Sequence, residues 1–195
     1  MPGPPRQFDE DEVVRIASDV FRERGYASTS LSEVQRRAGL SRQSLYNAFA
    51  NKETLFEAVL QLYEREQLGA LAEVLRGPGS GRTRLLQVLE ALAKEAKDAD
   101  CPGCLFANAV GELGADHGDI RARLRHGFDG LENAALEAAK DAIEAGELDA
   151  ALRPRDVARL VLALVEGVSV FNRLHTGPAF TQSVVRALRV LLGEA

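Results

Sequence analysis

The sequence predicts an all-α protein of about nine helices, three of which form an N-terminal unit. Apolar residues recur at spacings of three and four through most of the chain, and no segment alternates apolar and polar residues as a half-buried strand does. Glycine and proline separate the periodic segments, most clearly in the stretch GPGSG at residues 77–81. The 195 residues are 46% hydrophobic, which is ample for a core in one domain or two small ones.

The first two helices are marked by apolar spacing and by a capping pair. Apolar side chains from Val13 to Phe21 follow helical spacing, and Gly25 is a stop signal. Ser30 and Glu33 have the spacing of a capping box, which opens a short second helix that extends to Ala38.

The segment AGLSRQSLYNAFANKETLF, residues 38–56, has the pattern of the second half of a helix-turn-helix. Gly39 provides a turn position where a positive φ is tolerated, and Ser41 can cap the helix that follows. That helix has two faces, an apolar one with Leu45, Ala48 and Phe49 and a polar one with Arg42, Gln43, Tyr46 and Asn47. Arginine suits guanine edges, glutamine and asparagine suit adenine edges, and a tyrosine hydroxyl suits phosphate. The pattern is therefore typical of a helix that reads DNA.

The distribution of charge agrees with a local DNA contact. The net charge of −5 argues against a general nucleic-acid coat, but no acidic residue lies between Glu33 and Glu53, where four basic residues occur. Residues 1–52 hold eight Lys/Arg and seven Asp/Glu, whereas residues 53–195 hold sixteen and twenty-two. A small basic patch on an acidic body favours sequence-directed binding.

The remaining helices belong to a second region, so we predict an N-terminal arm with a DNA-binding unit at 1–52 and a regulatory domain at 53–195. Asn51 can cap a long fourth helix, which ends at 77–81, and a fifth helix closes near Asp98. The CPGC stretch opens a sixth helix that ends around Gly114, and a seventh extends from about 119 to 145. Pro154 is suited to start an eighth helix through 157–174, and the ninth covers about 184–191.

Composition excludes several other classes of protein. The apolar stretch around residues 160–171 is shorter than the roughly 20 residues of a membrane span and contains charged residues. The N-terminal MPGPPRQF lacks the apolar core of a signal peptide, and two cysteines without an export signal favour a cytoplasmic protein. We expect no metal or cofactor, because Cys101 and Cys104 lack a second pair of zinc ligands and the three histidines are isolated.

The chain resembles the TetR family of bacterial transcriptional regulators over roughly Val13 to Leu60. The marks are the Phe-x-x-x-Gly-Tyr of residues 21–26, Thr29-Ser30, Ala38-Gly39-Leu40, Ser44-Leu45-Tyr46, Phe49 and Lys52-Glu53. The resemblance implies a dimeric regulator, most often a repressor, that is released from a palindromic double-stranded DNA operator by an effector. It also implies phosphate contacts for Thr29, Tyr46 and Lys52 and base contacts for Arg42 and Gln43. Gln43 and Ala48 depart from the residues common in the family, so no operator sequence is carried over.

Two kinds of effector are open at this point. In some relatives a Gly-Cys-Leu segment carries an oxidant-sensing cysteine, and Gly103-Cys104-Leu105 is similar to it. A helix N-terminus lowers a thiol pKa, so Cys104, with Cys101, is a candidate sensor; the alternative is that Cys104 is a small buried residue. A small molecule would instead enter a pocket between the fifth and eighth helices, with candidate lining residues Phe106, Asn108, Glu112, Phe128 and Phe171.

The eighth helix is apolar on nearly every side and therefore needs burial on two sides. A four-helix interface with a second copy would provide this, with expected contacts at Leu164, Val168, Val184, Leu188 and Leu191.

Two functions of other classes remain as alternatives. One is a thiol–disulfide enzyme that uses Cys101 and Cys104, although the strand-and-helix setting of such motifs is missing. The other is a helical module whose N-terminal unit binds protein.

Overall fold

The computed structural model describes residues 9–95, 103–113, 117–174 and 178–193. These ranges contain helices and no strand, so the all-α prediction is confirmed. The elements are α1 (Glu10–Ser28), α2 (Leu31–Ala38), α3 (Arg42–Ala48), α4 (Lys52–Tyr63), the π-helical η1 (Glu64–Leu68), α5 (Gly69–Arg76), α6 (Gly81–Glu95), α7 (Leu105–Glu112), α8 (Gly118–Glu144), α9 (Pro154–Arg173) and α10 (Pro178–Leu191). Because α4, η1 and α5 follow one another without a break, the described residues form nine separate helices.

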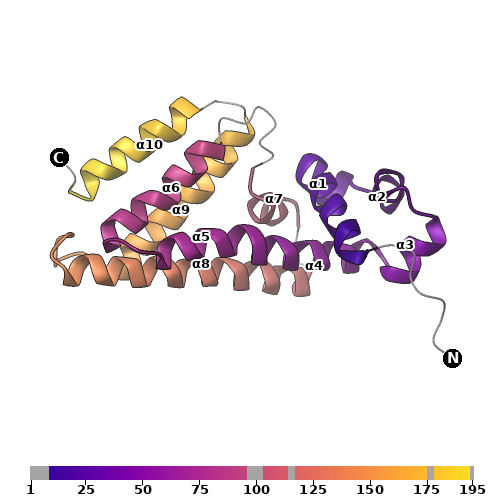
Figure 1. Ribbon diagram of the computed structural model, residues 1–195, viewed down its shortest axis with the longest axis horizontal. Coiled ribbons are helices and arrows are strands. Elements are labelled where there is room, and N and C mark those ends of the chain that lie inside the picture. The colour runs from indigo at the N-terminus through magenta and orange to yellow at the C-terminus, as the bar shows by residue number, and fades with distance from the viewer. Residues whose placement is uncertain (1–8, 96–102, 114–116, 175–177, 194–195) are drawn as a thin grey trace.

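The long helix α4–η1–α5 and α8 lie side by side and form the base of the molecule (Figure 1). Helices α6, α9 and α10 cover one end of this base, and α1–α3 form a separate head at the other end. Helix α7 lies between these two groups and packs against α1. The head is therefore connected to the rest of the molecule through α4 and through α7.

The predicted helix starts in the head are confirmed by their caps. The Ser30 hydroxyl accepts from the Glu33 N–H at 3.3 Å, and the Ser41 hydroxyl accepts from the Ser44 N–H at 3.1 Å. Asn51 and Thr54 form a complete capping box at the start of α4. The Glu33 carboxylate does not complete the box expected with Ser30, because it forms ion pairs with Arg36 and Arg24 instead.

Gly25 interrupts α1 as the sequence predicts. Its φ of +81° and ψ of 170° produce a kink after which α1 continues to Ser28. Thr29 then closes the helix, since its hydroxyl donates to the Gly25 carbonyl at 2.7 Å. The short return allows the rings of Phe21, Tyr26 and Phe56 to pack together in the centre of the head.

Two apolar clusters stabilise the fold. The first joins α1–α4 to α7 and the start of α8, and the second joins α5, α6, α8, α9 and α10. The first cluster thus continues past residue 52, and the predicted division of the chain at that point stays a prediction. In the second cluster α6 begins very close to α8, because a Cβ on Gly81 would lie 2.2 Å from the Ala138 carbonyl oxygen.

No helix in the described ranges is both long enough and apolar enough to cross a lipid bilayer.

Candidate functional site

The two faces predicted for α3 are present in the structure. Leu45 and Phe49 are buried and Ala48 is half-buried, so this face holds α3 against the head. The opposite face is exposed and consists of Arg42, Gln43, Tyr46 and Asn47. Gly39 has a φ of +64° and turns the chain between α2 and α3, which completes the helix-turn-helix.

The exposed side chains of α3 form two pairs, and the two members of each pair lie one helical turn apart. The Gln43 amide donates to Asn47 Oδ1 at 2.9 Å, and the Arg42 guanidinium lies 5.4 Å from the centre of the Tyr46 ring. Within the described part of the chain, Arg42 has no carboxylate partner. Its charge is therefore available to an anion or a base edge from outside.

Most of the other basic residues of the head are held by carboxylates or by backbone, and the Arg22 guanidinium lies 5.7 Å from the centre of the Tyr63 ring. Arg36 pairs with Glu33, and Arg37 donates to both oxygens of Glu23 at 2.9 and 2.8 Å. Lys52 Nζ donates to the Ala27 carbonyl at 3.3 Å. Burial lowers the pKa of the Lys52 ammonium, and the nearby Glu112 carboxylate partly offsets this effect.

Thr29 does not belong to the exposed surface. It is only 3% exposed, and its hydroxyl is used inside the head to cap α1. The role in phosphate contact that the family resemblance implied for its side chain does not fit this position, because capping the kinked α1 requires the residue inside.

Glu112 lies against the head and not in a ligand pocket, contrary to the expectation from the sequence. Its Oε2 accepts from the Ala27 N–H at 2.8 Å. Its Oε1 fills the space beside Gly25, where an added Cβ would come within 2.2 Å of it. The end of α7 is thereby fixed to the last turn of α1, which precedes the helix-turn-helix.

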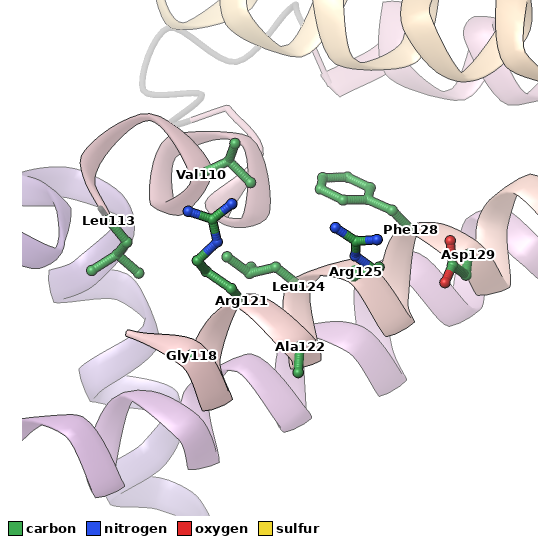
Figure 2. A pocket seen from close by; sticks show the side chains of 9 residues that line it. All are labelled: Val110, Leu113, Gly118, Arg121, Ala122, Leu124, Arg125, Phe128 and Asp129. Carbon is green, nitrogen blue, oxygen red and sulfur yellow. The ribbon is translucent and has the colours of Figure 1, made fainter. Parts of the chain in front are cut away.

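A groove between α7 and α8 has a volume of about 550 Å³ and includes the predicted residue Phe128. Figure 2 shows Arg121, Arg125 and Phe128 on the face of α8 that is turned toward α7. Val110 and Leu113 from α7 complete its apolar part.

A second, smaller cavity of about 140 Å³ lies among α4–η1–α5, α6 and α9. We refer to it as the central cavity. Apolar side chains make up most of its wall, and Cys104 and Glu166 both line it. Cys104 caps α7, since its Sγ accepts from the Ala107 N–H at 3.5 Å. The same Sγ donates to Glu166 Oε1 at 3.9 Å.

The lowered thiol pKa expected for Cys104 is wrong. Burial, and next the Glu166 carboxylate, raise the pKa of Cys104 to about 12. The backbone N–H groups of Ala107 and Phe106 at the start of α7 lower this pKa, but the loss of hydration outweighs them. Cys104 therefore matches the alternative of a small buried residue, while Cys101 lies outside the described residues.

The other predicted effector residues are scattered. Phe106 is fully buried in the first cluster, with its ring against Tyr63 and Phe128. Asn108 is half-buried on α7 and lines neither of the two cavities described above. Phe171 is on the outer face of α9, stacked on Phe180 at 4.3 Å.

The predicted dimer residues fall into two groups. Val168 and Leu188 are each 1% exposed and belong to the second apolar cluster, so their assignment to the interface is wrong. Leu164 and Val184 are half-buried, and Leu191 is exposed. Further apolar side chains are exposed on α9, α10 and the residue after α9, namely Leu160, Val170, Phe171, Leu174 and Val190. Periodicity shows that a helix is apolar on two sides but not which side meets its own core.

Comparison with known families decides the identity of this fold. Residues 14–59 match the family described as bacterial regulatory proteins of the tetR family, and residues 81–188 match the tetracyclin repressor-like C-terminal domain. The chain belongs to the TetR family. It contains both the N-terminal and the C-terminal domain of this family of bacterial regulatory proteins.

Individual TetR-family relatives resemble this chain over different lengths. The repressor BdcR of Escherichia coli K12 is 30% identical over 127 residues, 65% of this chain and 64% of that protein. The repressor ComR of the same organism is 34% identical over 125 residues, 63% of this chain and 60% of that protein. The chain thus spans less than two thirds of the length of these curated relatives. A cysteine-substituted CifR, solved with a 26-bp double-strand operator DNA, is 28% identical, with a TM-score of 0.85 over 96% of this chain and 98% of that one.

Two features of interest, the position of Glu166 at a cavity and the contact of Glu112 with Ala27, were not predicted from the sequence. Glu166 had a usable signal, because it is a single carboxylate in a nearly all-apolar helix segment. The contact of Glu112 with Ala27 had none, since 85 residues separate the two positions and no periodic pattern connects them.

Proposed function

We propose that this protein is a homodimeric cytoplasmic repressor that binds a palindromic DNA operator through α3 of each protomer and leaves it when a small molecule binds. The observation that carries the proposal is the exposed face of α3, where Arg42, Gln43, Tyr46 and Asn47 stand over a buried apolar back. Such a helix fits the major groove with its N-terminal residues at base edges.

Within this proposal the side chains have different roles. Arg42, Gln43 and Asn47 contact bases, which requires the Gln43–Asn47 hydrogen bond to be exchanged for bonds to DNA. Tyr46 contacts phosphate with its hydroxyl. Lys52, at the start of α4 and anchored on Ala27, adds positive charge beside the head.

The homodimer is supported by the apolar side chains that α9 and α10 leave exposed. Leu160, Val170 and Leu191 are 45%, 50% and 70% exposed in the single chain. Monomeric soluble proteins rarely expose a large contiguous apolar patch, and two-fold pairing of these helices would bury it. We also propose the division into a DNA-binding region at 1–52 and a regulatory region at 53–195, because α1–α3 form the head and α4 begins at Lys52.

A small-molecule effector is favoured over thiol modification, because the raised pKa of Cys104 disfavours the reactive thiolate. The thiol–disulfide enzyme and the protein-binding module are both set aside by the family to which the chain belongs.

Selection of bound duplexes from a random DNA pool tests the proposal. We expect a palindromic sequence to be enriched, with two half-sites about one helical turn or more apart. Absence of enrichment, or enrichment of a single asymmetric site, would contradict dimeric operator binding.

A further inference from the structure

The central cavity is lined largely by apolar side chains and contains one acidic group. Leu68, Leu71 and Val74 come from the long base helix, Leu92 from α6 and Val165 from α9. Glu166 is the one acidic residue among the described lining residues, and none of these is basic. A molecule in this cavity therefore meets an apolar wall with a single carboxyl group.

The carboxyl group of Glu166 has unused hydrogen-bonding capacity. Its Oε2 is buried and has no hydrogen-bond partner among the described residues. Its Oε1 accepts only the weak and long hydrogen bond from Cys104 Sγ, at 3.9 Å. Buried polar atoms are nearly always partnered in folded proteins, so an orphaned carboxylate oxygen at a cavity wall indicates a missing donor.

Two other polar side chains of α9 at the same wall, Ser169 and Asn172, are already hydrogen-bonded. The Ser169 hydroxyl donates to the Val165 carbonyl at 2.9 Å. The Asn172 amide donates to the Leu92 carbonyl at 3.5 Å, and its oxygen accepts from Thr181 at 3.1 Å. These groups hold α9 in place, which leaves Glu166 as the group that can recognise a ligand by charge.

The electrostatics of the cavity determine which charge a ligand should carry. Burial raises the pKa of Glu166 to about 7, offset in part by the hydrogen bond from Cys104. In the empty cavity the ionised form of Glu166 is therefore disfavoured. A cation beside Oε2 would favour the ionised form again by direct charge pairing. An anionic ligand would be repelled, and a neutral apolar one would leave Oε2 unpaired.

We propose that the central cavity binds a small organic cation, a primary alkylammonium ion, whose ammonium group pairs with the Glu166 carboxylate. The volume of about 140 Å³ corresponds to about four or five water molecules at roughly 30 Å³ each, so the ligand has about five non-hydrogen atoms. The alkyl part lies against Leu68, Leu71 and Val74.

This inference deepens the proposed function, on which its regulatory part rests. Tyr63, Gln67 and Leu68 line the cavity and belong to η1 or border it. A π-helical segment is often found at functional sites, and this one lies in the helix that continues through α4 to the head (Figure 1). A ligand that repacks η1 would therefore shift the head relative to the base.

Calorimetric titration of the full chain without DNA tests the site. The probes are ethyl- to hexylammonium chloride, each compared with the alcohol of the same chain length. We expect one ammonium ion of intermediate length to bind about tenfold or more tighter than its alcohol, as a charged hydrogen-bonded pair implies. Glu166→Gln should abolish that preference, whereas the exposed control Glu137→Gln on α8 should keep it.

A second variant keeps the carboxylate and removes the space. Ala91→Leu places extra volume at the cavity wall and should weaken binding of the longer ammonium ions first. Equal binding of amines and alcohols by the wild-type chain, or an amine preference that persists in Glu166→Gln, would overturn the proposal.

Titration of the selected operator with and without the bound ammonium ion distinguishes binding of the cation from its effect on DNA affinity. We expect the ion to lower operator affinity in the wild-type chain and not in Glu166→Gln. Ammonium binding without any change in DNA affinity would contradict the regulatory role but not the cation site. Failure to bind DNA at all would contradict the proposed function, and the calorimetric result would still decide the site.

Discussion

Substitution of Gln43 tests whether base contacts and phosphate contacts are made by different residues on the exposed face of α3. Its amide is exposed and is held by Asn47 at 2.9 Å in the absence of DNA. We predict that Gln43→Ala relaxes base preference at one symmetric pair of operator positions and costs about 1–3 kcal/mol of discrimination for each lost bidentate contact. Tyr46→Phe should instead weaken all sequences to a similar degree.

Binding of the two variants to single-base-pair variants of the selected operator measures this difference. A change of preferred sequence in Tyr46→Phe as large as that in Gln43→Ala would contradict the assigned roles.

Glu166 makes stability depend on pH in a defined direction. Its pKa of about 7 in the folded chain exceeds the value of about 4.3 expected when unfolded, so the folded state binds the proton more tightly. Stability is therefore highest at low pH with respect to this group and falls as pH rises through about 4 to 7. The titratable groups that share the cavity with it in the described chain are Cys104, whose pKa is raised to about 12, and Tyr63, whose pKa is also raised by burial, so neither contributes in this range.

We predict that Glu166→Gln is more stable than the wild type at neutral pH, by an amount on the order of 2–3 kcal/mol that shrinks toward pH 4. Urea unfolding of both chains across this pH range measures the difference. A difference that does not change with pH would show that Glu166 is not buried as the structure has it.

At the scale of elements, the contact between α7 and the head depends on the space at Gly25. We predict that Gly25→Ala destabilises the chain by about 1–3 kcal/mol, because alanine is strained at a φ of +81° and its Cβ would overlap Glu112. Gly39→Ala is the matched control, since its φ is +64° but no atom lies within 4 Å of the added Cβ.

Unfolding free energies of these variants, and of Gly25→Ala combined with Glu112→Ala, provide the test. The second substitution should recover part of the loss at Gly25. Equal losses for Gly25→Ala and Gly39→Ala, with no recovery, would mean that Glu112 does not occupy the space.

The elements that could be predicted from sequence are those whose causes are local. Ser41 and Asn51 cap helices through residues three positions away, and Gly39 turns the chain by its own backbone freedom. Spacing along one helix also predicts that Leu45 lies on the buried face of α3 and Tyr46 on the exposed face. These features depend on neighbours in the chain and not on the tertiary fold.

The errors concern choices between distant partners. Leu188 has the same apolar character as Leu191, yet one faces the core of its own chain and the other faces outward. Cys104 begins a helix, as expected, but its pKa is raised by burial in the tertiary fold and next by Glu166, which is 62 residues away. The sequence predicts Glu112 in a pocket because it lies in the sixth predicted helix, while its partner Ala27 lies at the end of α1.

At the scale of the whole molecule, the exposed apolar side chains of α9 and α10 form the proposed dimer interface. We predict that Leu191→Glu dissociates the proposed dimer while leaving the helical fold intact, because this side chain is 70% exposed in one chain. Leu188→Glu should instead unfold the protomer, at a loss on the order of 4 kcal/mol, since it puts a charge into the second apolar cluster. Sedimentation and circular dichroism distinguish the two results, and a Leu191→Glu chain that remains dimeric would place the interface elsewhere.

The central claim is that two linked heads read one palindromic operator. Titration of the wild-type chain with the selected full palindrome and with a duplex that carries only one half-site measures this directly. We predict two chains per full palindrome and a loss of affinity of about 10²-fold or more on the half-site duplex, because the second head then has no specific contact. Equal affinity for the two duplexes, with one chain bound to each, would contradict the account.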